Sequence, residues 1–304
     1  MAHVILTGGL GHIGSALLKP LGEVHNIAVV DNFSTSRYPS LYADNLPASG
    51  IRYIEGDICT YDLKSLFRGR DVVIHLAAIT DAATSALRPA DVYWVNYHGT
   101  ERVGEACVAN GCRLLFPSTT SVYGKSEGLV DETSVLRPQS PYASSKLRAE
   151  QYLKTVDGLR FVILRWGTIY GASRGMRFHT FVNSACWAAA TGKPIKVWKT
   201  ALHQKRPYLY LGDAYRSVSH IIDKDLFNGD VYNVLTGNHS VSDILDVVRK
   251  YKNDVSVRTT DSPILNQNSY TVSYSKIRDT GWEPTGNLEA GIAETMELLS
   301  RIHR

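Results

Sequence analysis

The chain has 304 residues, of which 44% are hydrophobic and 20% are charged, as in an ordinary globular protein large enough for one core and a second lobe. Its 33 basic and 29 acidic side chains are mixed along the sequence and leave a net charge of +4, so nucleic-acid binding is not indicated. No apolar run approaches the roughly 18 residues of a membrane span, and the first apolar run is too short for a signal peptide.

The four cysteines are spaced without any pair of the Cys-x-x-Cys type, and they form no disulfide framework. Such usage is typical of a reducing compartment. We therefore expect a cytoplasmic protein. The cysteines are Cys59, Cys107, Cys112 and Cys186.

The first element is an apolar run over residues 4–6, which predicts a buried parallel strand. Gly8, Gly11 and Gly14 follow at a spacing of three, and residues 13–18 resemble the first turns of a helix. A strand, a glycine-rich turn and a helix make a phosphate site, because the backbone approaches the anion closely and the helix start presents free N–H groups.

Residues 27–30 predict a second strand that ends at Asp31, about 20 residues beyond the glycines. A carboxylate at that place accepts the ribose hydroxyls of an adenosine and repels a 2′-phosphate. The pattern therefore predicts a dinucleotide, with NAD favoured over NADP. The polar residues 33–37 are expected beside the adenosine end of that cofactor.

Residues 51–54 predict a third strand and residues 71–76 a fourth. Asp57, after the third strand, has two interpretations: it accepts the adenine amino group while Ile58 covers the ring, or it caps a helix over residues 61–67. The fourth strand ends in the small residues Ala77 and Ala78, which allow a flat ring to lie against the backbone.

Helical periodicity covers residues 91–110, and a fifth strand at 114–116 precedes a second helix that starts at Pro141 and runs to about residue 155. Residues 160–166 predict a sixth strand. Six strands that alternate with helices predict an α/β fold with a Rossmann-type doubly wound parallel sheet. We assign residues 1–166 to this NAD-binding domain and 167–304 to a smaller α+β substrate-binding lobe that ends in a helix over 288–302, with the chain free to cross between lobes.

Tyr142 and Lys146 lie four residues apart and therefore share one helix face. A free tyrosine, with a pKa of about 10, is a poor base, but a nearby ammonium and an oxidised nicotinamide ring both favour the phenolate. Such a phenolate removes a proton from a sugar hydroxyl while the carbon loses hydride to the cofactor. Thr119, at the end of the fifth strand, is placed to bind the same oxygen.

At these residues the chain resembles the extended short-chain dehydrogenases/reductases that act on nucleotide sugars, most closely the UDP-glucose 4-epimerase-like branch. The resemblance covers essentially the whole chain. It is carried by the segments at 7–14, 31–32, 56–58, 75–78, 96–100, 118–124, 140–146 and 281–284.

The resemblance implies a bound NAD that oxidises C4 of a hexose to a transient ketone, after which an epimerase returns the hydride to the other face. It makes Thr119, Tyr142 and Lys146 the catalytic residues. The residues expected to bind the cofactor are Gly8, Gly11, His12, Ile13, Asp31, Asn32, Phe33, Ser34, Thr35, Ser36, Asp57, Ile58, Leu76, Ala77, Ala78, Asn96, Tyr142, Lys146 and Gly167.

In the second lobe, Arg206 matches a family arginine that binds the substrate diphosphate. The alternative interpretation of Arg206 is a solvated cation in a loop. Thr168 stands where the family usually has asparagine. A second diphosphate arginine, expected near Ile264, is missing, and Arg177 is a possible replacement. The residues expected to bind substrate are Thr80, Thr119, Tyr123, Tyr142, Thr168, Arg177, Asn183 and Arg206.

Dehydratases and decarboxylases of this family carry acidic residues before Val-Tyr-Gly, where this chain has Thr120 and Ser121. This disfavours a dehydratase or decarboxylase and leaves a 4-epimerase or a simple C4 oxidoreductase. The leading hypothesis, from the resemblance, is a 4-epimerase of the UDP-hexose type. The alternatives are a 4-dehydrogenase, 4-keto reductase or dehydratase on another nucleotide sugar, and a dinucleotide sensor without turnover. UDP is assumed as the nucleotide of the substrate by default, and GDP-, CDP- and dTDP-sugars stay open as alternatives. The family also implies a homodimer paired through the helices at 91–110 and 141–155.

Overall fold

The computed structural model describes residues 1–42, 51–81, 85–126, 128–260 and 270–301. Its centre is a seven-stranded sheet in the order β11-β7-β5-β4-β1-β2-β3, and every neighbouring pair is parallel. The order reverses between β1 and β4, as in doubly wound folds, so the predicted fold class is confirmed. The strands are β1 (His3–Thr7), β2 (Asn26–Asp31), β3 (Ile51–Glu55), β4 (Val72–His75), β5 (Arg113–Thr119), β7 (Phe161–Trp166) and β11 (Val231–Val234).

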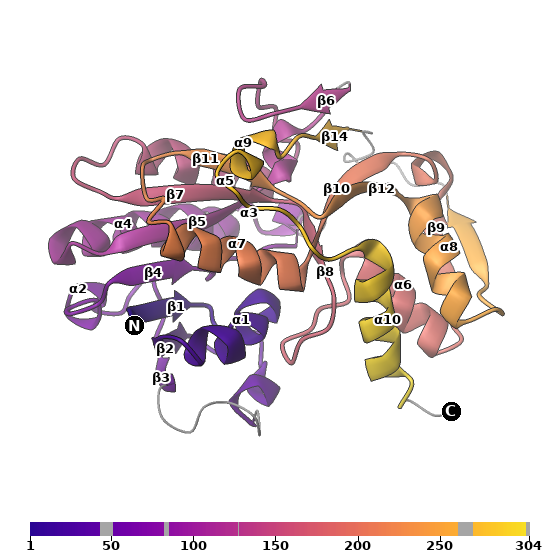
Figure 1. Ribbon diagram of the computed structural model, residues 1–304, viewed down its shortest axis with the longest axis horizontal. Coiled ribbons are helices and arrows are strands. Elements are labelled where there is room, and N and C mark those ends of the chain that lie inside the picture. The colour runs from indigo at the N-terminus through magenta and orange to yellow at the C-terminus, as the bar shows by residue number, and fades with distance from the viewer. Residues whose placement is uncertain (43–50, 82–84, 127, 261–269, 302–304) are drawn as a thin grey trace.

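Helices bury both faces of this sheet (Figure 1). In β1, Val4 and Leu6 face one core and Ile5 the other, which explains the uninterrupted apolar run. The first core is closed by α1 (His12–Gly22) and α7 (Leu211–Asp223), and the second by α2 (Leu63–Leu66), α4 (Gly99–Asn110) and α5 (Pro141–Leu153).

The helix expected over 91–110 is interrupted. It consists of α3 (Pro89–Tyr93), a π-helical turn (Trp94–His98) and α4. π-Turns are rare and recur at functional sites because the extra residue re-aims a side chain. Here the buried residue in the turn is Asn96.

The seventh strand was not predicted. The chain returns from the second lobe through α7, which packs on α1, and β11 then pairs with β7 at the sheet edge. Helix α7 therefore packs on the large sheet and β11 forms its edge, although both lie inside the range expected for the substrate lobe.

The second lobe is built on a small sheet in the order β12-β10-β8 and a parallel pair of β9 and β13 (Figure 1). Its strands are β8 (Thr168–Tyr170), β9 (Ile195–Trp198), β10 (Lys205–Tyr210), β12 (Gly237–Ser240) and β13 (Val257–Thr260), and its helices are α6 (Phe181–Ala190), α8 (Val241–Tyr251) and α10 (Leu288–Leu299). Helix α10 ends three residues before the expected residue 302, which lies outside the described residues.

Short elements complete the chain. β6 (Leu129–Val130) pairs with β14 (Thr271–Val272), followed by α9 (Ser275–Arg278). The 3-10 turns cover Tyr38–Tyr42, Ser85–Leu87, Thr120–Tyr123 and Lys199–Ala201. Within the described residues, no helix is long and apolar enough to span a membrane.

Candidate active site

The glycine-rich turn joins β1 to α1 and is fixed by close backbone contacts. Gly8 has a φ of +67°, and a Cβ there would lie 2.6 Å from the Ala77 Cα. The first helical hydrogen bond is donated by Ser15 N–H to the Gly11 carbonyl, at 2.9 Å, so the amides of residues 12–14 precede it. These amides at a helix start fit the diphosphate of a dinucleotide.

Asp31 ends β2 and faces this turn. Its carboxylate accepts hydrogen bonds from Leu10 N–H (3.1 Å) and Phe33 N–H (3.0 Å). Phe33 and Ser36 hold left-handed φ values of 54° and 52°, which shape the loop after the carboxylate. This placement fits the expected role on the adenosine ribose.

Asp57 does not cap α2, because Asp62 does so by accepting from Ser65 N–H. The Asp57 carboxylate instead accepts from Asn32 Nδ2 and Cys59 N–H, both at 2.8 Å. Burial would raise the pKa of Asp57, but these hydrogen bonds outweigh it and lower the pKa. The helix-cap interpretation was therefore wrong, and the adenine interpretation stays a prediction.

The segment after β4 lies against the glycine turn. Its Ala77 backbone fills the space that a Gly8 side chain would need, and Leu76, Ala77 and Ala78 are all partly exposed. Further along, the Thr80 Oγ1 is buried without a hydrogen-bond partner among the described residues. A buried hydroxyl without a partner is expected where a ligand supplies one.

The three catalytic candidates meet at the carboxyl edge of the sheet. Thr119 ends β5, and its side chain lies close enough to the Tyr142 hydroxyl to lower the Tyr142 pKa. Helix α5 carries both Tyr142 and Lys146, because Pro141 starts it and the Ser140 side chain caps it by accepting from Ala143 N–H. The Lys146 ammonium donates to the Pro117 carbonyl at 2.8 Å.

The protonation of this group is set by burial. Burial raises the pKa of Tyr142, and the Thr119 hydrogen bond and the Arg177 charge lower it in part. Burial also lowers the pKa of Lys146 to about 7, against the opposing effect of Glu150. The resting site therefore holds a neutral phenol beside a lysine that titrates near neutral pH.

Asn96 joins two backbone segments of the site by hydrogen bonds. Its amide oxygen accepts from Ile79 N–H (2.8 Å), and its amide nitrogen donates to the Ile79 carbonyl (2.9 Å) and to Ser145 Oγ (3.1 Å). The π-turn thus ties the segment after β4 to the residue next to Lys146. Asn96 was expected to bind the cofactor, and its described hydrogen bonds indicate that it supports the backbone of the site.

Residues 172–177, here called the crossing segment, run from the second lobe over the glycine turn. Ser15 Oγ accepts from Gly175 N–H at 2.9 Å, and a Cβ at Gly175 would lie 2.5 Å from the Leu10 and Gly11 carbonyl oxygens. The Arg37 guanidinium donates to the carbonyls of Gly175 and Met176. Sequence reasoning missed this contact, which joins parts of the chain about 140 residues apart.

His12 and Asn183 also form hydrogen bonds with the crossing segment. The His12 Nδ1 and the Ser173 Oγ are hydrogen-bonded at 2.7 Å, and burial lowers the His12 pKa to about 3, so the ring is neutral. Asn183 is fully buried; its amide bonds to Gly171 and to the Arg177 carbonyl. Asn183 therefore positions the crossing segment, and its expected contact with the sugar nucleotide stays a prediction.

Arg177 and Arg206 lie in different surroundings. Burial and the Arg37 charge lower the pKa of Arg177 to about 10, whereas Tyr142 and Asp81 raise it, which places Arg177 near the catalytic phenol. Arg206, on β10, instead influences the pKa of Tyr208 and Tyr270. Ile264, near which the second diphosphate arginine was expected, lies outside the described residues.

Gly167 and Thr168 link the two lobes. Gly167 N–H donates to the Val234 carbonyl of the large sheet at 3.0 Å, and Thr168 pairs with Tyr208 in the small sheet. A Cβ at Gly167 would lie 3.1 Å from the Pro207 backbone.

Tyr123 does not lie where a substrate contact was expected. Its side chain is fully buried, and its hydroxyl donates to Asn233 Oδ1 (2.7 Å) and accepts from Arg165 (3.1 Å). This expectation is corrected by the structure: the hydroxyl belongs to a buried network that the sequence signalled only by placing the charged Arg165 inside an apolar strand.

A dinucleotide turn at the same sheet edge as the neighbouring Thr119 and Tyr142 and a buried lysine defines an enzyme of the NAD-dependent Rossmann class. Comparison with known proteins is more specific: residues 4–234 match the model of the NAD-dependent epimerase/dehydratase family. The chain belongs to this family, which confirms the resemblance and NAD as the cofactor.

Individual relatives cover nearly the whole chain. YtcB of Bacillus subtilis (strain 168), described as an uncharacterized UDP-glucose epimerase, is 29% identical over 320 residues, 99% of each chain. A dTDP-D-glucose 4,6-dehydratase of Mus musculus is 28% identical over 97% of this chain and 87% of its own. The structure of a UDP-glucuronic acid 4-epimerase from Bacillus cereus with UDP-glucuronic acid and NAD has a TM-score of 0.87 at 26% identity, covering 99% of this chain and 100% of that one.

Proposed function

We propose that this protein is a nucleotide-sugar 4-epimerase that uses NAD and acts on a UDP-hexose. The observation that carries the proposal is the group at the carboxyl edge of the sheet. There the Thr119 side chain lies close enough to the Tyr142 hydroxyl to lower its pKa, Lys146 follows one helical turn later, and the turn that fits a dinucleotide starts from the same edge. A base and a hydride acceptor at one place are what the oxidation of a secondary alcohol needs.

Each residue has a distinct role in this proposal. Tyr142 takes the proton from the C4 hydroxyl and later returns it, while Thr119 holds the same oxygen. The Lys146 ammonium favours the phenolate form of Tyr142. NAD, when bound, takes up the C4 hydride and gives it back to the sugar.

Cationic and hydroxyl side chains around this group are proposed to hold the substrate. Arg206 binds the diphosphate, because a guanidinium offers paired donors to phosphate oxygens. Thr80 has the buried hydroxyl without a described partner, and Arg177 lies close enough to Tyr142 to influence its pKa. Thr168 is proposed to contact the sugar from the strand that joins the lobes.

The alternatives differ in what they do with the 4-keto sugar. A dehydratase, as in the mouse relative, needs an acid and a base for the loss of water, and Thr120 and Ser121 cannot act so at neutral pH. A 4-dehydrogenase or 4-keto reductase uses the same residues but exchanges its cofactor. A dinucleotide sensor has no use for the Tyr142 base.

A spectrum of the purified protein in the reduced-nicotinamide band, before and after addition of UDP-glucose, separates these functions. We expect cofactor that stays with the protein and interconversion of two C4 epimers. Net, stoichiometric reduction of cofactor would indicate a dehydrogenase, loss of water a dehydratase, and no response a sensor. Thermal stabilisation by a panel of UDP-, GDP-, CDP- and dTDP-sugars then identifies the nucleotide.

The homodimer also stays a proposal. The helical run from α3 to α4 exposes Trp94 and Val108, with exposed fractions of 53% and 40%, and apolar side chains on paired helices are typical of subunit contacts. We expect light scattering to give twice the chain mass of 33.6 kDa. A monomeric mass would contradict this expectation.

A further inference from the structure

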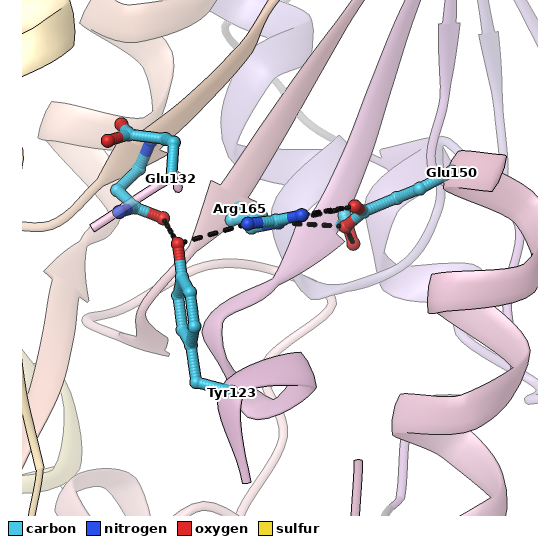
Figure 2. Close-up of polar contacts among 6 residues, drawn as sticks. Tyr123, Glu132, Glu150 and Arg165 are labelled. Carbon is cyan, nitrogen blue, oxygen red and sulfur yellow. Dashed lines mark hydrogen bonds and ion pairs between the residues drawn. The ribbon is translucent and has the colours of Figure 1, made fainter. Parts of the chain in front are cut away.

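A charged pair lies inside the protein between the catalytic helix α5 and strand β7 (Figure 2). Glu150 of α5 and Arg165 of β7 are only 1% and 2% exposed. The Arg165 Nη2 donates to Glu150 Oε2 at 2.7 Å, and its Nε lies 3.2 Å from both carboxylate oxygens. Buried charges are rare and costly unless they are paired in this way.

The pair is anchored on both sides. Ser118 Oγ donates to Glu150 Oε1, and the Tyr123 hydroxyl accepts from Arg165 and donates to Asn233, as Figure 2 shows for the labelled Tyr123. Every one of these bonds has the carboxylate as an acceptor or supports the arginine that faces it. Glu150 is therefore held as an anion in a fixed position.

Lys146 is the neighbour of this anion on the active-site side. The two residues are four apart on α5 and so lie on one face of the helix. They also bind adjacent residues of β5, because Lys146 donates to the Pro117 carbonyl while Glu150 accepts from Ser118. The helix is thus fastened to the strand by a cation and an anion side by side.

Among the described residues, no other group around Lys146 supplies a negative charge that raises its pKa. The Phe116 ring centroid lies 4.4 Å from its Nζ, and His75 of β4 is neutral because burial and the Lys146 charge lower its pKa to about 3. Tyr142 is a neutral phenol in the resting site. Arg165 is positive and lies behind Glu150.

We propose that Glu150 is a positioning residue that keeps Lys146 protonated and in place beside Tyr142, with Arg165 and Ser118 holding its carboxylate. The inference rests on the proposed function only for the role of Tyr142 as a base. Loss of the anion leaves burial unopposed, so Lys146 gives up its proton at a lower pH. The phenolate of Tyr142 then loses its neighbouring cation in neutral solution, and turnover falls there.

The test is Glu150→Gln, which keeps the side-chain shape and an oxygen acceptor but removes the charge. We expect the basic limb of the kcat/KM pH profile to move down by about one unit or more, the size of effect that a neighbouring charge has. Activity should fall about tenfold above the shifted limb and stay within a few-fold of the unchanged protein below it. Glu150→Asp, which restores the charge, should move the limb back.

The matched control is Asp213→Asn in α7, since Asp213 is also fully buried and paired with an arginine, Arg216, but lies outside the active site. It is expected to cost stability without moving the limb. An equal loss of activity at every pH in Glu150→Gln, as for a purely structural residue, or a limb that stays in place would overturn the proposal.

A direct readout separates this inference from the proposed function. With ¹³C-labelled lysine, the Lys146 signal, assigned by its loss in Lys146→Met, should titrate at a lower pH in Glu150→Gln whether or not the protein is an epimerase. If Glu150→Gln does not fold, the double variant E150Q/R165M is used, which removes both charges of the pair. Replacing both charges destabilises a protein less than leaving one buried charge without its partner. The same downward shift is expected there, and an unchanged titration would overturn the proposal.

Discussion

Replacing Tyr142 by phenylalanine is expected to lower turnover by about 10²- to 10⁴-fold, the usual contribution of a general acid–base group. The change removes one oxygen, which in the structure lies close enough to Thr119 for that residue to lower its pKa, and leaves the ring in its place on α5. The glycine turn does not depend on that oxygen, so the variant should keep its NAD. Initial rates of epimer interconversion and the cofactor content of the purified protein measure both effects.

Tyr152→Phe is the matched control, because Tyr152 lies on the same helix and its ring packs edge-on against Tyr97. It should leave the turnover unchanged. Near-normal turnover in Tyr142→Phe would remove the proposed base and with it the epimerase mechanism. A loss of both turnover and cofactor would instead show that the phenol supports the dinucleotide site.

The parts of the fold that were predictable are those recorded in local patterns. Buried parallel strands need apolar side chains on both faces, so the runs around Val4 and Ile27 could be recognised without knowledge of their partners. A glycine turn at Gly8 and a Tyr–Lys pair on one helix face are likewise local. These features predicted β1, β2 and α5 as the structure has them, and the site roles of the residues on these elements stay predictions.

The parts that were missed depend on contacts between distant residues. β11 was not predicted, because it is a strand of only four residues and the chain reaches it by leaving the large sheet after β7 and returning through α7. The docking of Gly175 on the glycine turn has no periodic signal at all. Arg165 inside an apolar strand did signal a buried partner, but that partner is identified only by the packing of α5 on the sheet.

Gly8→Ala is expected to abolish the retention of NAD. A left-handed φ costs an alanine about 1–2 kcal/mol. The contact adds to this, because the new Cβ would lie 2.6 Å from both the Ala77 Cα and the Ala77 nitrogen, and backbone atoms cannot turn away as a flexible side chain does. The turn and the segment after β4 must therefore separate, and both are expected to line the cofactor site.

The chain offers a control that divides this effect into its two parts. Gly69 has a φ of +70°, close to the +67° of Gly8, but a Cβ there meets nothing within 4 Å among the described residues. Gly69→Ala should therefore lose only about 1–2 kcal/mol of unfolding free energy and keep its NAD. Denaturant unfolding and the cofactor content of both variants check this. Equal stability and equal NAD content in the two variants would mean that the Gly8–Ala77 contact does not shape the site, because backbone strain alone would then account for the glycine.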